Sequence, residues 1–286
     1  MKIIPVAYDS FSTRSMATIV KTDINIFIDP SVAIGIYRYG LKPHRIELEE
    51  LERKKEEIIS LNKNIDIIII THYHWDHCPH PNSKHFEILY NKKIFLKDIN
   101  NKINNSQKVR GKRVIKKLEN KSDLIFSDGK EFEINNTYIK FSEPLTHGGP
   151  ESKLGFVLGV YIEYKNNSVI FASDIQGLYE DSLKFILSNN PKILIFSGPP
   201  YYIGWNENKE ETFINNLKII AERTNIKEII IDHHSARDKK FLNNLNKYRD
   251  MLKEYNIEIK SAADLLGVEN RLLEANRDIL YKNDNI

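Results

Sequence analysis

The feature that most constrains this chain is the isoleucine-rich run Ile65–Ile70, which leads directly into Thr71-His72-Tyr73-His74-Trp75-Asp76-His77. A short, nearly continuous run of β-branched residues is typical of a central β-strand that is covered on both faces. Three histidines and an aspartate at the end of such a strand are costly to keep there unless they bind something. Imidazole and carboxylate groups are ligands that suit divalent zinc, iron and manganese. The sequence therefore predicts a metal site at the carboxyl end of a buried strand.

The spacing within this motif has a geometric consequence. His72 and His74 are two residues apart, so in extended backbone their side chains point the same way. Asp76 and His77 follow where the chain can turn, and they can face a second metal. A solvated polar loop is the alternative interpretation, but it does not explain why further ligand-type residues follow other strands.

Isolated ligand-type residues do follow other apolar strands. His147 and Asp174 each come shortly after one such strand, and the pair His233 and His234 follows another. Open α/β sheets place their binding sites in the loops beyond the carboxyl ends of strands. These residues can therefore join the first motif in a single site.

Strand-like and helix-like segments occur in both halves of the chain, which favours a layered α/β fold with mixed sheets. The predicted strands cover residues 17–20, 24–28, 65–70, 121–126, 138–141, 156–164, 168–172, 193–196 and 228–231, and the predicted helices cover 46–61, 98–121, 213–220 and 241–252. No internal repeat or linker-like stretch divides the 286 residues. We therefore expect a single domain over residues 1–286, with a basic, helical insertion around 98–121.

The composition excludes several classes of protein. A hydrophobic fraction of 41% is too high for an intrinsically disordered chain, and a net charge of +3 gives no global attraction to nucleic acid or membrane. The apolar runs are far shorter than the ~20 residues of a membrane span. The N-terminus lacks a signal-peptide pattern, and the single cysteine excludes an internal disulfide. We expect a cytoplasmic protein with no membrane partner.

The order of the ligand-type residues resembles the metallo-β-lactamase superfamily of hydrolases. The signature of that superfamily is His-x-His-x-Asp-His, then a single His, an Asp and a final His, each at a strand end. All of these elements occur here in that order, and the resemblance covers essentially the whole chain. It implies an α/β fold, the four-layer αββα sandwich of two mixed sheets flanked by helices. Within the superfamily, the chain looks like an archaeal group.

The resemblance implies two metal ions held by seven side chains. The seven are His72, His74 and His147 for one ion, Asp76, His77 and His233 for the other, and Asp174 as the bridge between them. Zinc is the expected metal, with manganese or iron as the alternatives.

A second similarity indicates whether His233 or His234 is the last metal ligand. The segment Asp232-His233-His234-Ser235-Ala236-Arg237 is similar to the His-Phe-Ser-x-Arg stretch of the tRNA 3′-processing nucleases, whose histidine is a ligand. That favours His233 as the ligand and leaves His234 as a proton donor or a structural residue. Asp29, which follows a strand, matches the early aspartate of the superfamily, which accepts the second N–H of a metal-bound histidine.

One segment departs from the superfamily pattern. Cys78-Pro79-His80-Pro81 stands where many members have Gly-Gly, which argues against glyoxalase II and the true β-lactamases. This departure favours the sugar-lactonase and nuclease branches of the superfamily. Cys78 either touches the site or fills a small buried apolar position. His80 and His85 are expected to be structural or at the surface.

The expected chemistry is metal-assisted hydrolysis. Two divalent metals about 3.5–4 Å apart can share one water and lower its pKa toward neutrality, which gives a hydroxide nucleophile. Asp76, Asp174 and His234 are the expected catalytic residues. No Gly-x-Ser-x-Gly elbow and no Gly-x-x-x-x-Gly-Lys loop is present. The bond attacked would be an ester, lactone, thioester or phosphodiester.

Three classes of function stay open. The first is a small-molecule hydrolase of the lactonase kind. The second is a nuclease or phosphodiesterase acting on RNA or DNA, because the basic stretch 102–121 could neutralise phosphates; a solvated helix face is its alternative interpretation. The third is a non-catalytic metal-binding module, against which the intact ligand set speaks. Trp75, Trp205 and the segment 197–202 are candidates for lining the substrate pocket.

Overall fold

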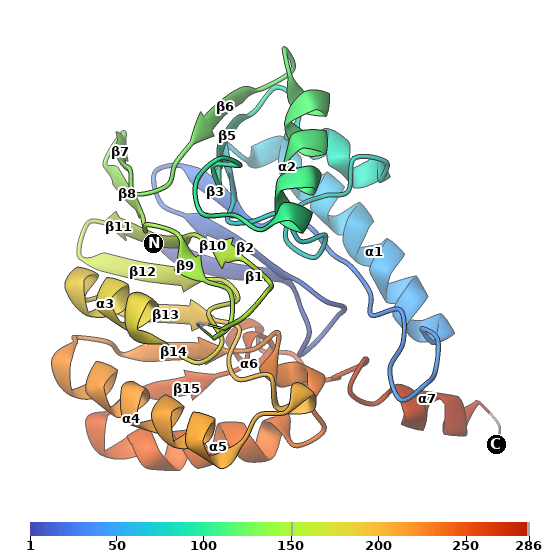
Figure 1. The fold of residues 1–286 in the computed structure, drawn as a ribbon, viewed down its shortest axis with the longest axis vertical. Coiled ribbons are helices and arrows are strands. Elements are labelled where there is room, and N and C mark those ends of the chain that lie inside the picture. Colours follow the sequence, from blue (N-terminus) through green and yellow to red (C-terminus); the bar gives the residue numbers. More distant parts are fainter. Residues whose placement is uncertain (150, 285–286) are drawn as a thin grey trace.

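Two β-sheets pack face to face in the computed structural model, which describes residues 1–149 and 151–284 (Figure 1). The first sheet has the strand order β1-β2-β3-β4-β5-β6. Its strands are β1 (Lys2–Tyr8), β2 (Met16–Lys21), β3 (Asn25–Ile28), β4 (Ile67–Ile70), β5 (Lys93–Leu96) and β6 (Asp123–Phe126). The first three strands pair antiparallel and β3 to β6 pair parallel, so the sheet is mixed.

The second sheet has seven strands in the order β15-β14-β13-β12-β11-β8-β7. Its strands are β7 (Glu131–Ile134), β8 (Thr137–Phe141), β11 (Gly159–Tyr164), β12 (Asn167–Ala172), β13 (Ile193–Phe196), β14 (Glu228–Ile231) and β15 (Glu258–Lys260). It too is mixed, because β12 to β15 pair parallel and the others antiparallel. A small antiparallel pair, β9 (Leu145–Thr146) and β10 (Phe156–Val157), lies between β8 and β11 in the sequence.

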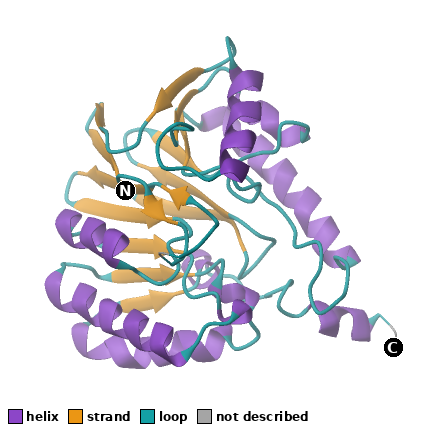
Figure 2. Ribbon diagram, viewed as in Figure 1, coloured by secondary structure: helices purple, strands orange, loops and turns teal. Residues whose placement is uncertain are grey.

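Helices cover the outer face of each sheet (Figure 2). The first sheet is covered by α1 (Arg45–Leu61) and α2 (Asn105–Leu118), and the second by α3 (Glu180–Asn189), α4 (Glu207–Arg223) and α5 (Phe241–Leu252). Two short helices, α6 (Ala262–Leu266) and α7 (Arg277–Asn283), complete the chain. The fold therefore has four layers: helices, the first sheet, the second sheet and a second set of helices.

The isoleucine run forms a strand that is buried on both faces. Ile67 and Ile69 of β4 point into the core between the two sheets, whereas Ile68 and Ile70 point into the core beneath the helices. β12 has the same double burial, since Phe171 faces the first sheet and Ile170 faces the helices. A strand buried on both faces is apolar at every position, which confirms the prediction of a central strand here.

Several predicted elements differ from the observed ones at their ends. The stretch predicted as one strand over 156–164 is divided into β10 and β11, and the helix predicted over 98–121 is the shorter α2, which connects the parallel strands β5 and β6. Four strands of the two large sheets, β1, β5, β7 and β15, were not predicted, nor was α3.

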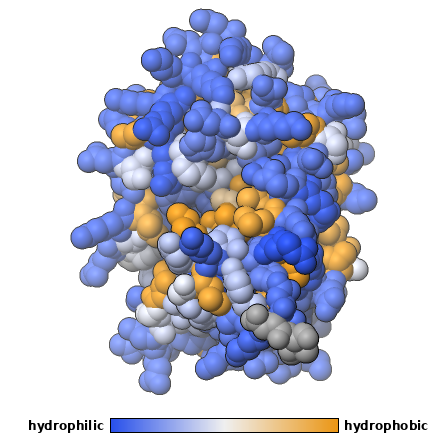
Figure 3. Space-filling view, turned by 90° about the vertical axis from the view of Figure 1, so that its right-hand side faces the viewer, coloured by the Kyte–Doolittle hydropathy of each residue, from blue (hydrophilic) through white to orange (hydrophobic). Residues whose placement is uncertain are grey.

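The face in Figure 3 is largely hydrophilic, with a group of hydrophobic residues near its middle. No helix in the described ranges is long and apolar enough to cross a lipid bilayer.

The topology brings strand ends from both sheets together. Because β1, β3 and β4 run in the same direction, their carboxyl ends lie at one edge of the first sheet. The parallel strands β12, β13 and β14 likewise end at one edge of the second sheet. The ligand-type residues follow these strands.

Candidate metal centre

All seven predicted ligands lie together at these strand ends. In each group that they form, the possible ligand atoms lie within 4.8 Å of one another. Two groups consist only of predicted ligands: His72, His74, His147 and Asp174; and Asp76, His77 and His233. Two more groups add Asp29 to His72 and His77, and His234 to Asp174 and His233. His74 and Asp76 are partly exposed and the other members are buried, so the cluster is reachable from one side.

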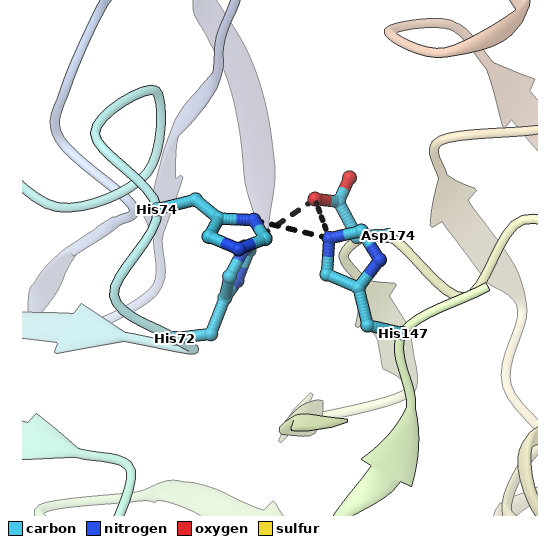
Figure 4. A group of neighbouring side chains, drawn as sticks. All are labelled: His72, His74, His147 and Asp174. Carbon is cyan, nitrogen blue, oxygen red and sulfur yellow. Dashed lines mark hydrogen bonds and ion pairs between the residues drawn. The ribbon is translucent and has the colours of Figure 1, made fainter. Parts of the chain in front are cut away.

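The first group joins three loops (Figure 4). His72 and His74 follow β4, His147 follows β9, and Asp174 follows β12. His74 Nδ1 lies 3.1 Å from His147 Nε2. Asp174 Oδ2 lies 2.9 Å from His147 Nε2 and 3.3 Å from His72 Nε2. The nitrogens and the carboxylate oxygen therefore surround a common point, as the ligands of one metal do.

The second group lies on the other side of Asp174. His77 Nε2 and His233 Nε2 are 3.3 Å apart, and Asp76 Oδ2 lies 3.6 Å from His233 Nε2. Asp174 Oδ2 is 3.3 Å from His77 Nε2, and its Oδ1 is 3.4 Å from His233 Nε2. Asp174 thus contacts both groups, which is the geometry that a bridging carboxylate requires.

The backbone is left-handed at three of these strand ends. The φ angles are +48° at Asp29, +51° at Asp174 and +47° at His233. This conformation is uncommon for residues other than glycine, although Asp, Asn and His tolerate it best. Left-handed residues of this kind cluster at functional sites, where the surrounding structure holds them.

Asp29 orients the histidines that follow β4. Its carboxylate accepts from the Thr71 backbone N–H at 2.8 Å, from the Thr71 hydroxyl at 2.7 Å and from His77 Nδ1 at 2.9 Å. Since the Thr71 hydroxyl donates to Asp29, it accepts from His72 Nδ1 at 3.0 Å. Both histidines then carry their proton on Nδ1 and present the Nε2 lone pair to the cluster, which is the tautomer that a metal needs. This agrees with the role expected for Asp29.

Asp9 plays the same part for His233, and the sequence analysis missed it. Asp9 follows β1, and its carboxylate accepts from His233 Nδ1 at 2.6 Å and from Arg237 Nε at 2.8 Å. Burial alone would raise the pKa of Asp9, but the charges of Arg237 and His233 outweigh burial and hold the pKa below its usual range. The signal for Asp29 was its position directly after a predicted strand; Asp9 also follows a strand, but β1 was not predicted.

Arg237 is the second residue whose role the sequence analysis missed. Its guanidinium is 3% exposed and donates to Asp9, to Asp76 at 3.2 Å and to the Tyr202 hydroxyl at 3.2 Å. It also donates to His233 Nε2 at 2.9 Å. Arg237 therefore ties the second ligand group to the loop that contains Tyr202.

His234 has the opposite tautomer to His233. His234 Nε2 faces a carboxylate oxygen of Asp174, which favours a proton on that nitrogen; Nδ1 then accepts from the Tyr202 hydroxyl, 3.0 Å away, which itself accepts from Arg237. The proton of His234 is then on Nε2, which faces Asp174 Oδ1 at 3.3 Å. Burial lowers the pKa of His234 to about 3, so the ring is neutral. A neutral ring with Nε2–H directed at the cluster can donate a hydrogen bond and cannot ligate a metal through that nitrogen.

The polar atoms of the cluster fit divalent cations. Among the described residues, His72 Nε2 and Asp174 Oδ1 are buried without a hydrogen-bond partner. Buried polar atoms normally have a partner. Burial alone would lower the pKa of His77, but the charges of Asp174 and Asp76 outweigh burial and raise it well above its usual value. The cluster therefore attracts positive charge as well as presenting lone pairs, and metal cations would supply both partners.

The other residues singled out in the sequence have structural surroundings. Cys78 is fully buried in the core beneath the helices of the first sheet. His80 stacks edge-on against Trp75, with ring centroids 4.6 Å apart, and His85 is buried beside Ser31 and Ser83. None of these three residues belongs to a metal-type group within the described ranges.

Comparison with known proteins shows close relatives. No protein-family model matches the chain. A UPF0282 protein of Saccharolobus solfataricus is 38% identical over 291 residues, and one of Sulfurisphaera tokodaii is 40% identical over 294 residues; each alignment covers 100% of this chain and 94% of the relative. A UPF0282 protein of Methanopyrus kandleri is 38% identical over 298 residues, covering 98% of this chain and 99% of that protein.

Solved structures show the same fold at low identity. CmlA, a diiron β-hydroxylase from Streptomyces venezuelae, has a TM-score of 0.51 and 10% identity over 89% of this chain, which spans about half (51%) of CmlA. Zn²⁺-bound PqqB from Methylobacterium extorquens has a TM-score of 0.50 and 11% identity, covering 87% of this chain and 85% of PqqB. The arrangement of two mixed sheets flanked by helices is the metallo-β-lactamase fold, which confirms the four-layer sandwich expected from the sequence.

Asp174→Asn should weaken metal binding more than folding. The substitution keeps the size of the side chain but removes the charge that offsets the repulsion between two nearby cations. We expect the loss of at least one metal per chain, measured by elemental analysis, and retention of the fold by circular dichroism. Asp98→Asn, outside the cluster, is the control. Two fully bound metals in Asp174→Asn would contradict the bridging role.

Asp9→Asn should lower the affinity for the metal held by His233. Loss of an outer carboxylate partner typically costs about 10–100-fold in metal affinity. Asp128→Asn is a matched control, because Asp128 is also a buried carboxylate and it pairs with Lys97 at 2.6 Å, outside the metal-type groups. Both variants should lose thermal stability, but only Asp9→Asn should bind zinc more weakly in a competition titration with a chelator. Equal zinc affinity in the two variants would exclude an orienting role for Asp9.

Proposed function

The chain belongs to the UPF0282 family of archaeal proteins, and we propose that it is a metal-dependent hydrolase that cleaves an ester-type bond in a small-molecule substrate. One observation supports this proposal above all others. Histidines from three separate loops converge on the two oxygens of Asp174, which lies on a fourth loop. Histidine nitrogens gathered around a buried carboxylate are a donor set that divalent metals bind.

The ligand groups match a pair of divalent metals, with zinc as the proposed metal and manganese or iron as the alternatives. When bound, two such ions lower the pKa of a shared water and polarise the bond that is attacked. The chain's own residues would hold the metals and orient the ligands. Asp29 and Asp9 fix the rings of His77 and His233, and Asp174 contacts both ligand groups. Preorganised ligands of this kind need little rearrangement during a reaction.

We propose that His234 donates a hydrogen bond through Nε2–H to the oxygen of the leaving group. Arg237 donates to the Tyr202 hydroxyl, and Tyr202 donates to His234 Nδ1, so the Nε2–H faces the cluster. Negative charge develops on the leaving oxygen as its bond breaks, and loss of one preorganised donor of this kind typically costs about 10²–10³-fold in kcat. A non-catalytic metal-binding module has no use for such an oriented residue, which argues for the enzyme.

A nuclease remains the second candidate because of where helix α2 lies. Arg110 of α2 stacks over the ring of Trp75, inside the first motif, at 5.3 Å. Lys112, Arg113 and Lys116 are exposed on the same helix, so a basic surface adjoins the metal centre. Lys117, however, donates to the Pro81 carbonyl and lies over Phe86, so it is used within the fold. Fewer basic side chains of α2 are therefore available to contact phosphates than the sequence suggests.

Metal-loaded protein should bind two ions per chain and hydrolyse a small ester-type substrate. Elemental analysis after reconstitution with zinc, manganese and iron measures the stoichiometry. A panel of a lactone, a thioester, bis(p-nitrophenyl) phosphate and a single-stranded RNA at low salt measures the bond and the substrate class.

The outcomes of this panel separate the candidates. Turnover of one of the three small substrates, abolished by a chelator and absent in Asp174→Asn, is the expected result. RNA cleavage that falls steeply with salt and with alanine at Lys112, Arg113 and Lys116 would favour the nuclease instead. Less than a tenth of an equivalent of any metal would refute the metallohydrolase.

His234→Ala should slow catalysis without removing metal. For a substrate with a poor leaving group, such as an alkyl ester, we expect kcat to fall by about 100-fold or more, because the charge on the leaving alkoxide loses its hydrogen bond. For a p-nitrophenyl substrate the fall should be much smaller, since p-nitrophenolate spreads its charge over the ring. His80→Ala, in the loop after the first motif, is the control. An equal loss for both leaving groups would argue against this role of His234.

A further inference from the structure

A pocket with a volume of about 450 Å³ is lined by residues that lie close in sequence to His147 and Asp174. Its walls come from three segments, which follow β9, β12 and β13, and they include Ser152, Leu154, Gln176, Tyr179, Pro200 and Trp205. The volume is in the range of small-molecule pockets, which are mostly apolar with a few placed polar groups. None of the metal-cluster residues is among those that line this pocket.

Two walls of the pocket continue directly from ligand loops. Gly149 lies two residues after His147, and Gln176 lies two residues after Asp174. Two residues of chain span at most about 7 Å, so a ligand in the pocket is within reach of the metal centre. The backbone N–H of Gly148 donates to the Asp174 carbonyl at 3.0 Å, which ties the two walls together. A molecule of modest size can therefore occupy the pocket and the centre at once.

Tyr179 and Trp205 give the pocket a fixed aromatic wall. A Cβ atom on Gly177 would lie 2.7 Å from the Tyr179 ring and 3.1 Å from the Trp205 ring, so both rings pack against this glycine. Trp205 Nε1 donates to Glu210 at 2.9 Å, and its ring packs edge-on against Phe213. Flat, immobilised rings favour stacking or edge contact with another ring.

Gln176 adds one polar group that lacks a partner. The residue is 5% exposed, and its Nε2 makes no hydrogen bond to any described residue. A buried amide donor normally has an acceptor, and the pocket that Gln176 lines is where a ligand would supply one. The charged residues of the pocket, Glu151 and Lys209, have opposite signs, so charge alone does not select the ligand.

We propose that this pocket binds a planar heteroaromatic ring of the substrate, with the ring against the Tyr179–Trp205 wall and a ring acceptor atom on the Gln176 amide. The ester-type bond of the same molecule then lies at the metal centre. This inference rests on the proposed function, because it assigns the substrate class of that hydrolase. It makes Gln176 and Trp205 specificity-determining residues.

The test compares adenosine 5′-monophosphate with ribose 5-phosphate, which lacks the ring but keeps the sugar and the phosphate. Calorimetric titration of the zinc-loaded full chain should give a Kd for adenosine 5′-monophosphate at least tenfold lower than that for ribose 5-phosphate. Gln176→Glu keeps the shape of the side chain but replaces the donor by an acceptor, and it should reduce this preference severalfold or more. Asn215→Ala, on the exposed side of α4, should leave the preference unchanged.

A fluorescence readout places the ring. The chain has two tryptophans, so in Trp75→Phe the emission comes from Trp205 alone. Adenosine 5′-monophosphate should change this emission and ribose 5-phosphate should not. Equal affinity for the two compounds, no binding of adenosine 5′-monophosphate, or an unchanged preference in Gln176→Glu would each overturn the inference.

The experiments distinguish an error in the pocket assignment from an error in the proposed function. If the parent protein binds metals and hydrolyses a small ester but shows no ring preference, only the pocket assignment is wrong. If it prefers adenosine 5′-monophosphate but binds less than a tenth of an equivalent of any metal, the metallohydrolase is wrong and the ring site stands.

Discussion

A single carboxylate is the interaction on which this structure depends. The two oxygens of Asp174 lie 2.9–3.4 Å from nitrogens of five histidines, which are His72, His77, His147, His233 and His234. His72 and His77 follow a strand of the first sheet, whereas Asp174, His233 and His234 follow strands of the second. The cluster therefore exists only when the two sheets are packed, and metal binding should be coupled to that packing.

The same edge of the fold supplies both the ligands and the residues that orient them. Asp29 at the end of β3 holds His77, and Asp9 at the end of β1 holds His233. Parallel strands place their carboxyl ends side by side, so short loops suffice to bring these side chains together. Arg237 offsets the charge of Asp9 and, through Tyr202, sets the tautomer of His234. The Nδ1 atoms of the two adjacent histidines thus have different partners, so His233 presents a lone pair to the cluster and His234 presents an N–H.

Much of the fold could be predicted because burial leaves a periodic pattern. The doubly buried strands β4 and β13 are uninterrupted apolar runs, β14 is apolar after its first residue, Glu228, and their positions followed from that pattern. β1 was missed because Lys2 and Pro5 interrupt its apolar pattern, and β15 because it has only three residues. With β1 missed, the role of Asp9 could not be recognised, since its meaning comes from standing at a strand end.

The sequence by itself determined the ligand types, their order along the chain and the buried strand that carries the first motif. These features depend on neighbours within a few residues, and local spacing is visible in a sequence. Only the tertiary structure decided which nitrogen of each histidine faces the cluster, that Asp9 orients His233 across 224 positions of the chain, and that a pocket adjoins Asp174. The physical reason is that tautomers and cavities are set by contacts between segments remote in sequence, and these contacts exist only after the two sheets have packed.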